Sequence, residues 1–266
     1  MTGRIDLSAK KLFLFDLDGV FYKGKERRIK IGGTRIVKEL RRRGKKLFVL
    51  TNNSTDTADT VWSRLIETGV PVRRDEVLTS SVVTAQHLRS KFGKVTYYLV
   101  GERGLETEMR RFGHRRVEGD RADFVVVGLD RHLTYEKLNQ ATTVARNGAP
   151  IVATHTSALY MARDGPAMAT GPIVRALEYA AGKKSIEVGK PATLMFKVAL
   201  KDAGCTAREA LMVGDQLDTD IEGARRAGID SILVKTGVDK DISGTRALAA
   251  ISNVDDLVGL FGDKGD

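Results

Sequence analysis

The residues with the clearest capacity for chemistry are aspartates that directly follow short apolar runs. Asp16 and Asp18 come after the run Leu12–Phe15. Asp215 follows a second run, Leu211–Val213, with one glycine between. A carboxylate is costly to bury unless a cation or hydrogen-bond donors accompany it. Aspartates in these positions therefore indicate a site that supplies either a cation or a cage of hydrogen-bond donors.

A third apolar run, Leu47–Leu50, ends in Thr51 and Asn52, and Lys190 lies further along the chain. In an open α/β sheet, ligands bind outside the carboxyl ends of the strands. If the three runs are parallel strands of one sheet, their terminal polar residues converge at one edge. The sequence then predicts a site with several carboxylates, a hydroxyl, an amide and an ammonium group.

These residue types favour phosphate chemistry with Mg²⁺. The acids offer hard oxygen ligands, and no cluster of histidines or cysteines accompanies them. A carboxylate beside the metal can attack phosphorus and form an aspartyl-phosphate, and a neighbouring carboxyl can move the proton. Each piece alone has a simpler explanation. Asp-x-Asp-Gly can be a turn, and Thr51, Ser54 or Asp130 can cap a helix.

The elements that would position these residues alternate along the chain. Apolar periodicity predicts strands over 12–15, 46–50, 95–100, 124–127, 151–153, 210–213 and 231–234. It predicts helices over 33–43, 56–68, 80–91, 105–112, 135–146, 172–181, 193–203, 221–227 and 254–261. Residues 154–170 are expected to be irregular. This strand–helix alternation is typical of a parallel sheet.

Four segments, in this order, carry a resemblance to a known family. They are Phe15-Asp16-Leu17-Asp18-Gly19-Val20, Thr51-Asn52-Asn53-Ser54, Gly189-Lys190-Pro191 and Gly214-Asp215-Gln216-Leu217-Asp218-Thr219-Asp220. Together they resemble the motifs of the haloacid dehalogenase-like (HAD) hydrolases. The Thr-Asn-Asn-Ser segment and the spacing to Lys190 resemble class IIA, the NagD-like or 4-nitrophenylphosphatase-like subfamily. The resemblance covers about residues 11–260.

The resemblance implies an α/β fold with two domains. A Rossmann-like, parallel-sheet core domain would consist of residues 1–79 and 188–266. An inserted α/β cap domain, residues 80–187, would set substrate specificity.

The resemblance also implies a role for each matching residue. Asp16 would be the nucleophile and a metal ligand. Asp18 would be the general acid and base, with its backbone carbonyl on the metal. Thr51 would hold the phosphoryl group, and Asn52 and Asn53 would contact substrate.

The later motifs complete this set. Lys190 would neutralise the nucleophile and bind the phosphate. Asp215 would be the third protein ligand to Mg²⁺, and Asp220 would support the metal. Asp218 is left as a helix cap or a site residue.

One cap segment departs from the family pattern. Related proteins carry Thr-Asn-Pro-Asp where this chain has Thr154-His155-Thr156-Ser157. The resemblance implies that this loop helps to select the leaving group. His155 and Ser157 are therefore candidate substrate ligands, and the departure leaves the identity of the substrate open.

The predicted activity is Mg²⁺-dependent hydrolysis of phosphomonoesters, with a small phosphorylated metabolite as substrate. Sugar phosphates, glycerol phosphate, phosphoglycolate and aryl phosphates fit this class. A phosphotransferase or mutase on the same core is one alternative. A non-enzymatic nucleic-acid-binding protein is another, suggested by the net charge of +10. The densest basic run, Arg41–Lys46, closes an amphipathic helix, so no nucleic-acid partner is expected.

Composition bears on the compartment. No apolar run approaches the roughly 20 residues that a membrane helix needs. Residues 1–11 are polar and lack the apolar core of a signal peptide. The single cysteine, Cys205, excludes an internal disulfide and fits a reducing compartment. These features predict a cytoplasmic protein without a membrane partner, and they leave a homodimer open.

Overall fold

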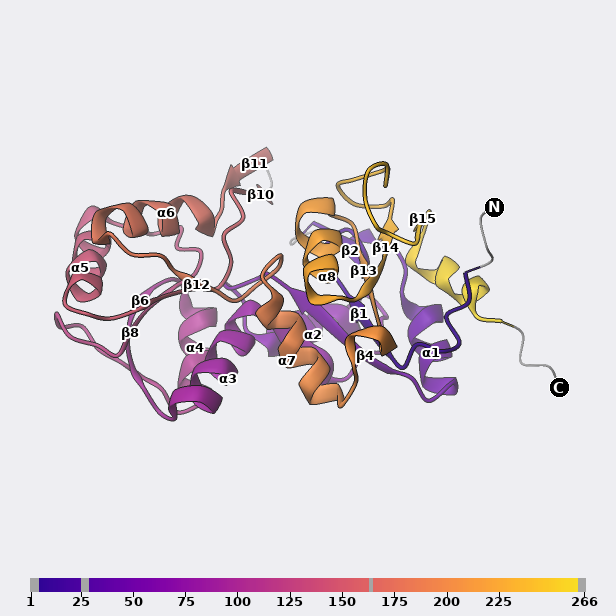
Figure 1. Cartoon of the computed structure of the whole chain (residues 1–266), viewed down its shortest axis with the longest axis horizontal. Coiled ribbons are helices and arrows are strands. Elements are labelled where there is room, and N and C mark those ends of the chain that lie inside the picture. Colours follow the sequence, from indigo (N-terminus) through magenta and orange to yellow (C-terminus); the bar gives the residue numbers. More distant parts are fainter. Residues whose placement is uncertain (1–4, 25–28, 163–164, 263–266) are drawn as a thin grey trace. The chain divides into compact units, whose positions relative to one another are not determined.

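The computed structural model describes residues 5–24, 29–162 and 165–262, which form two compact units (Figure 1). The first unit comprises Met1–Thr51, Val61–Val77 and Phe196–Asp266, as far as these are described. The second comprises Asn52–Thr60 and Leu78–Met195. The predicted insertion, residues 80–187, lies within the second unit. The motif residues Asn52, Asn53 and Lys190 belong to the second unit as well.

A six-stranded sheet, in the order β15-β14-β13-β1-β4-β5, organises the first unit. Its strands are β1 (Leu12–Phe15), β4 (Lys46–Thr51), β5 (Val77–Thr79), β13 (Ala210–Gly214), β14 (Asp230–Val234) and β15 (Ala249–Ile251). Strand β1 pairs in parallel with β13 on one side and with β4 on the other. All four of its residues are buried, as expected for a central strand covered on both faces. The three apolar runs that precede the motif residues are therefore adjacent strands.

The remaining elements of this part of the chain are helical or short strands. They are α1 (Thr34–Arg42), α2 (Ala58–Glu67), α7 (Thr193–Ala203), α8 (Glu222–Ala227), the 3₁₀ helices η1 (Arg74–Glu76), η2 (Ala207–Glu209) and η4 (Val254–Leu260), the π-helical turn η3 (Leu217–Ile221), and the antiparallel pair β2 (Tyr22–Lys23) and β3 (Ile29–Lys30). The final helix predicted over 254–261 is a 3₁₀ helix.

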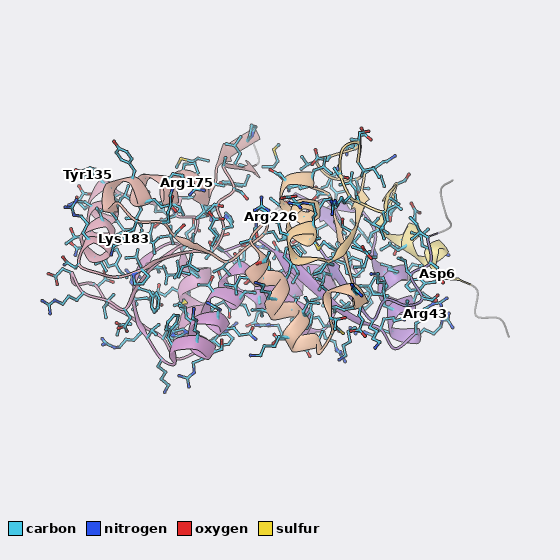
Figure 2. All side chains as sticks on the ribbon, in the orientation of Figure 1. Asp6, Arg43, Tyr135, Arg175, Lys183 and Arg226 are labelled. Atoms are coloured by element: carbon cyan, nitrogen blue, oxygen red, sulfur yellow. The ribbon has the colours of Figure 1, made fainter. Side chains whose placement is uncertain are left out.

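The basic run at the end of α1 is held by acidic neighbours. Arg41 forms an ion pair with Glu76, and Arg42 and Arg43 both bind Glu39. The Arg43 guanidinium also lies 4.6 Å from the centre of the Phe261 ring. The position of Arg43 is labelled in Figure 2. The hydrogen bonds from Arg42 and Arg43 lower the pKa of Glu39 to about 2. These arginines therefore serve the local structure of the helix end.

The second unit contains its own five-stranded sheet, in the order β12-β9-β8-β6-β7. Its strands are β6 (Thr96–Val100), β7 (Arg115–Arg116), β8 (Phe124–Val127), β9 (Ile151–Ala153) and β12 (Ile186–Glu187), and all of its pairs are parallel. Its helices are α3 (Ser80–Phe92), α4 (Arg103–Arg111), α5 (Tyr135–Arg146) and α6 (Thr170–Ala181). Helices α5 and α6 lie on one side of the sheet, and α3 and α4 lie on the other (Figure 1). The α/β class with parallel sheets is confirmed.

The expectation of an irregular segment over 154–170 is wrong for the part that the structure describes. Strands β10 (Leu159–Ala162) and β11 (Gly165–Met168) form an antiparallel ribbon. Leu159 lies opposite Met168, and Met161 lies opposite Pro166. All four of these side chains are exposed, so the ribbon shows no polar–apolar alternation. The pattern by which half-buried strands are recognised in a sequence is therefore missing here.

No helix in residues 5–24, 29–162 or 165–262 is long and apolar enough to cross a membrane.

Candidate active site

Three aspartates meet at the carboxyl end of the first unit's sheet. Asp16 follows β1 and Asp215 follows β13, which are adjacent parallel strands, and Asp220 lies in η3. One carboxylate oxygen of each residue lies within 4.8 Å of those of the other two, and all three residues are buried. Like charges this close disfavour ionisation unless a cation balances them. The cluster therefore has the charge and burial of a cation site.

The loop after β13 is shaped by Asp220. Its Oδ2 accepts hydrogen bonds from the backbone N–H groups of Asp215 and Gln216, both at 3.1 Å. A Cβ atom at Gly214 would collide with the Asp220 carboxylate, so only glycine fits there. Asp220 thus fixes the backbone that carries Asp215.

Asp18 and Thr51 lie near the same sheet edge in different environments. Asp18 is only partly buried, whereas Asp16 is 7% exposed. The chain turns directly after Asp18 at Gly19, which has a φ of 79°. Thr51 is the last residue of β4 and is buried. Asp16, Thr51 and Asp215 therefore stand at the ends of three adjacent strands, as the sequence required for a shared site.

The donor set of the aspartate cluster fits a hard divalent cation. The groups that meet there are carboxylates, and the group contains no histidine or cysteine. Oxygen ligands of this kind suit Mg²⁺, Ca²⁺ or Mn²⁺ and disfavour zinc or copper. The residues present thus fit the metal that the sequence predicts.

In the second unit, Lys190 is held by Asn52. The Asn52 Nδ2 donates to the Lys190 carbonyl at 2.8 Å, and the Asn52 Oδ1 accepts from the Lys190 N–H at 2.9 Å. A Cβ at Gly189 would lie 2.5 Å from the Asn52 Oδ1 and from the Thr154 carbonyl oxygen. Glycine at 189 therefore permits this close packing, and Lys190 itself is only 3% exposed.

His155 lies in the same neighbourhood of the second unit, after β9, the strand that pairs with β12. It is 7% exposed, and its Nε2 lies 3.3 Å from the Thr170 Oγ1. Burial, followed by the positive charge of Lys190, lowers the pKa of His155 to about 4. The imidazole is therefore neutral near pH 7. The Nδ1 of His155 and the Oγ1 of Thr154 have no hydrogen-bond partner among the residues that the structure describes.

The other predicted substrate residues have mainly local contacts. The Asn53 Oδ1 accepts the backbone N–H groups of Thr55 and Asp56 at 3.0 and 2.9 Å, and its Nδ2 donates to Asp56. Ser157 is partly buried, and its carbonyl accepts the Gly171 N–H at 2.9 Å near the start of α6. Asn53 thus shapes the turn after Asn52, and Ser157 anchors the loop before β10.

Two predicted caps have other functions. Thr57, and not Ser54, binds the backbone of α2, through the Thr60 N–H at 3.2 Å. The Ser54 Oγ instead accepts the Leu129 N–H at 3.1 Å. Ser54 and Leu129 are 75 positions apart, so local spacing could not reveal this contact.

Asp130 behaves in the same way. Thr134 caps α5. The Asp130 Oδ2 instead accepts a hydrogen bond from the Gly101 N–H at 3.1 Å, and the Asp130 carboxylate forms an ion pair with Lys137. Asp130 therefore joins the ends of β6 and β8.

The segment after β14 contacts the site, although the sequence patterns did not predict it. The Val238 N–H donates to the Asp215 Oδ2 at 2.8 Å, and the Asp239 N–H donates to the Asp215 carbonyl at 3.0 Å. The available signal was a glycine, Gly237, shortly after an apolar strand. That signal is common in α/β proteins and did not single out this loop.

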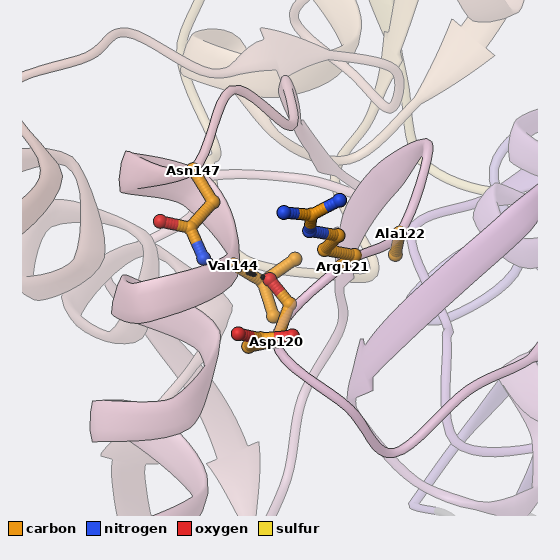
Figure 3. A pocket seen from close by; sticks show the side chains of 5 residues that line it. All are labelled: Asp120, Arg121, Ala122, Val144 and Asn147. Carbon is orange, nitrogen blue, oxygen red and sulfur yellow. Dashed lines mark hydrogen bonds between the residues drawn. The ribbon is translucent and has the colours of Figure 1, made fainter.

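A pocket of about 560 Å³ lies on the second unit away from the predicted site residues (Figure 3). Asp120, Arg121, Ala122, Val144 and Asn147 line it. The Asn147 Nδ2 donates to the Asp120 carbonyl at 3.0 Å. No predicted catalytic or substrate-binding residue contributes to this pocket, so it adds nothing to the candidate site.

Comparison with known proteins places the chain in a family. The HAD-hydrolase-like family model matches residues 187–258, and the haloacid dehalogenase-like hydrolase model matches residues 13–115. The 5′-nucleotidase YutF of Bacillus subtilis is 34% identical over 230 residues, which cover 86% of this chain and 89% of that protein. An acid sugar phosphatase of Staphylococcus epidermidis is 35% identical over 226 residues, covering 85% and 86%.

Comparison with solved structures identifies the same family. A 4-nitrophenylphosphatase from Thermotoga maritima superposes with a TM-score of 0.88 at 33% identity, covering 95% of this chain and 98% of that one. A p-nitrophenyl phosphatase from Archaeoglobus fulgidus gives 0.88 at 31% identity, covering 94% and 98%. The resemblance seen in the motifs is confirmed, and the chain belongs to the haloacid dehalogenase-like hydrolases, in the NagD-like or 4-nitrophenylphosphatase-like subfamily of class IIA.

Proposed function

We propose that the aspartate cluster of the first unit carries out the phosphomonoester hydrolysis expected of a phosphatase in this family. The observation that carries the proposal is the convergence of Asp16, Asp215 and Asp220 in a buried group at the carboxyl ends of parallel strands. A buried group of acids is expensive without a cation, and it is suited to binding one beside a phosphate.

The reaction has two balanced steps. A carboxylate oxygen of Asp16 attacks phosphorus, the bond from phosphorus to the leaving oxygen breaks, and Asp18 gives that oxygen a proton. Water then attacks the aspartyl-phosphate, Asp18 takes the proton, and phosphate leaves Asp16. The unequal burial of Asp16 and Asp18 supports this division of roles, because a partly exposed carboxyl exchanges protons with solvent more easily.

We assign the metal to the same cluster. Asp16 and Asp215 would hold Mg²⁺ through their carboxylates, and Asp18 through its backbone carbonyl. Asp220 would act through the loop, since its Oδ2 already binds two backbone N–H groups. The bound ion would neutralise charge on the phosphoryl oxygens.

The remaining motif residues would bind the phosphoryl group. The Thr51 hydroxyl and the Lys190 ammonium would contact phosphoryl oxygens. Asn52 would serve mainly by fixing Lys190, with its second amide hydrogen directed to substrate. Asn53 would support the same loop through its turn and contact substrate from there.

The substrate would be a small phosphorylated metabolite. Sugar phosphates, glycerol phosphate and phosphoglycolate are the predicted types, and aryl phosphates should also react. Relatives named as a 5′-nucleotidase, an acid sugar phosphatase and a 4-nitrophenylphosphatase support this range. His155 and Ser157 would contribute to the choice among them, because they replace the usual family residues in the cap loop.

Other expectations from the sequence stay predictions. They are a cytoplasmic location, the lack of a nucleic-acid partner, and the homodimer that the sequence leaves open. The rival activity, phosphoryl transfer by a phosphotransferase or mutase, differs in one measurable respect. A hydrolase releases phosphate and alcohol in equal amounts, whereas a transferase releases alcohol with little phosphate and needs an acceptor.

The test is phosphate release from a panel of these metabolites and from 4-nitrophenyl phosphate. We expect Asp16→Asn to abolish turnover and Asp18→Asn to lower it by about 10²–10⁴-fold. Asp241→Asn is the matched control, because Asp241 is an exposed acid whose Oδ1 accepts the backbone N–H groups of Ile242 and Ser243. Turnover that survives Asp16→Asn would sink the mechanism, and turnover in excess EDTA would sink the metal assignment.

The cap assignment has its own test. We expect His155→Ala to change the ranking of metabolites more than it changes turnover of 4-nitrophenyl phosphate. His132→Ala, at an exposed histidine of the same unit, is the control. An equal loss on every substrate would show that His155 is structural.

A further inference from the structure

The segment Thr236–Asp239, here called the β14 loop, contacts both the turn after Asp18 and the loop that carries Asp215. The Thr236 Oγ1 donates to the Gly19 carbonyl at 2.5 Å. The Val238 N–H donates to the Asp215 Oδ2 at 2.8 Å. The loop therefore bridges two separate motifs of the aspartate cluster.

Asp239 closes this arrangement from the other side. Its backbone N–H donates to the Asp215 carbonyl at 3.0 Å, and its Oδ2 accepts the Leu217 N–H at 2.7 Å. The backbone on both sides of Gln216 is thus tied to one residue of the β14 loop. Neither Asp239 nor Val238 belongs to the four motifs of the family.

Close packing adds to these hydrogen bonds. A Cβ atom placed on Gly237 would overlap the Asp215 Oδ2, and a Cβ on Gly19 would overlap the same oxygen. The Asp215 carboxylate is therefore packed between two glycines from different loops. The φ angle at position 237 is not positive, so the backbone there does not require glycine. The crowding by Asp215 alone excludes a side chain at this position.

We propose that the β14 loop is a positioning element for the metal site, which holds the Asp215 carboxylate in the orientation that binds the divalent cation. This inference rests on the proposed role of Asp215 as a metal ligand. The Val238 N–H fixes one carboxylate oxygen, the two glycines leave room for the carboxylate between their loops, and Asp239 fixes the backbone. A preformed carboxylate loses less conformational entropy when the cation binds.

The test is the affinity of the substrate-free protein for Mg²⁺, measured by isothermal titration calorimetry. Groups that orient metal ligands typically contribute about 10–100-fold to metal affinity. We expect losses of about that size for Gly237→Ala and Asp239→Ala, and a smaller loss for Asp239→Asn, which keeps an acceptor oxygen for the Leu217 N–H. Turnover of Gly237→Ala should recover as the Mg²⁺ concentration is raised, because the catalytic groups are intact.

Two control variants match these changes. Gly259→Ala adds a methyl group where the structure leaves open space in the same unit. Asp241→Ala removes an exposed acid close to Asp239 in the sequence. Both should bind Mg²⁺ like the wild type. Melting temperatures in EDTA show whether each variant is folded. If Gly237→Ala is not folded, Thr236→Val and the Asp239 variants carry the test.

The outcomes separate the inference from the proposed function. Folded variants of the β14 loop that bind Mg²⁺ within about twofold of wild type would overturn the inference while leaving the phosphatase mechanism intact. A wild-type protein that binds Mg²⁺ but releases no phosphate from any substrate would overturn the proposed function. The affinity difference between wild type and Gly237→Ala would still decide the inference in that case.

Discussion

The side chain of Asn52 binds both backbone polar groups of Lys190, as a neighbouring strand would. Its Nδ2 donates to the Lys190 carbonyl at 2.8 Å, and its Oδ1 accepts the Lys190 N–H at 2.9 Å. These residues are 138 positions apart in the chain. The amide thus links the second and third motifs of the family within one unit.

Loss of this link should lower activity through Lys190. We expect Asn52→Ala to reduce kcat/KM on 4-nitrophenyl phosphate by about tenfold to a hundredfold, because two hydrogen bonds to a largely buried backbone are each worth about 0.7–1.4 kcal/mol. Asn139→Ala, at an exposed asparagine on α5, is the control. Unchanged kinetics for Asn52→Ala would show that Lys190 is positioned by other contacts.

Packing at Gly189 should matter for the same reason. Alanine there would press on the Asn52 Oδ1 and the Thr154 carbonyl, each 2.5 Å from the added carbon. We expect Gly189→Ala to lower the free energy of unfolding by about 1–3 kcal/mol. Urea denaturation would measure this, with Gly119→Ala as the control because no described residue lies within 4 Å of a Cβ added there. A change below about 0.5 kcal/mol would contradict the close packing.

Repulsion among the three carboxylates of the aspartate cluster should lower the stability of the metal-free protein. We expect Asp16→Asn to raise the melting temperature in EDTA while it abolishes turnover, since it removes one of three buried carboxylates that face one another. We also expect Mg²⁺ to raise the melting temperature of wild type more than that of the variant. Equal melting temperatures in EDTA would indicate that the cluster is already neutral without the metal.

His155 should make stability depend on pH. Burial, and then the charge of Lys190, lowers its pKa from 6.5 to about 4. Above pH 6.5 the residue is neutral in both states, and its contribution is complete. As the pH falls from 6.5 toward 4, the unfolded chain binds a proton that the folded protein rejects, so stability is lost. The loss should reach about 2 kcal/mol near pH ~5.

His155→Asn should remove this part of the pH dependence. Urea denaturation of both proteins at several pH values would measure it. Burial also lowers the pKa of His114, so some slope should persist in the variant. Hydrogen bonds from Arg42 and Arg43 lower the pKa of Glu39 to about 2. The stabilisation by such carboxylates is complete above their unfolded pKa of 4.5, so they change the slope of stability against pH only below it. Identical slopes for both proteins above that pH would contradict the neutral, buried state of His155.

Much of the fold could be read from local patterns. Continuous apolar runs such as Leu12–Phe15 predicted buried parallel strands. Apolar periodicity predicted the helix over 33–43, and Ile36, Val37 and Leu40 form the buried face of α1 there. Each pattern reflects the period of its element. The ribbon of β10 and β11 was not predicted, because its exposed face is apolar and one strand contains Pro166. Strand β12 was not predicted, because a strand of two residues is too short to show periodicity.

The amino-acid sequence by itself determined which chemistry this protein can perform. Carboxylates at the ends of apolar strands, together with Lys190 and Thr51, predict a phosphate and metal site through residue type and order alone. Only the tertiary structure decided which residues hold these groups in place. The Asn52 amide on Lys190, the Thr170 hydroxyl beside His155 and the Val238 N–H on Asp215 join partners far apart in the chain. Such contacts depend on how strands and loops are packed, and no local spacing in the sequence encodes them.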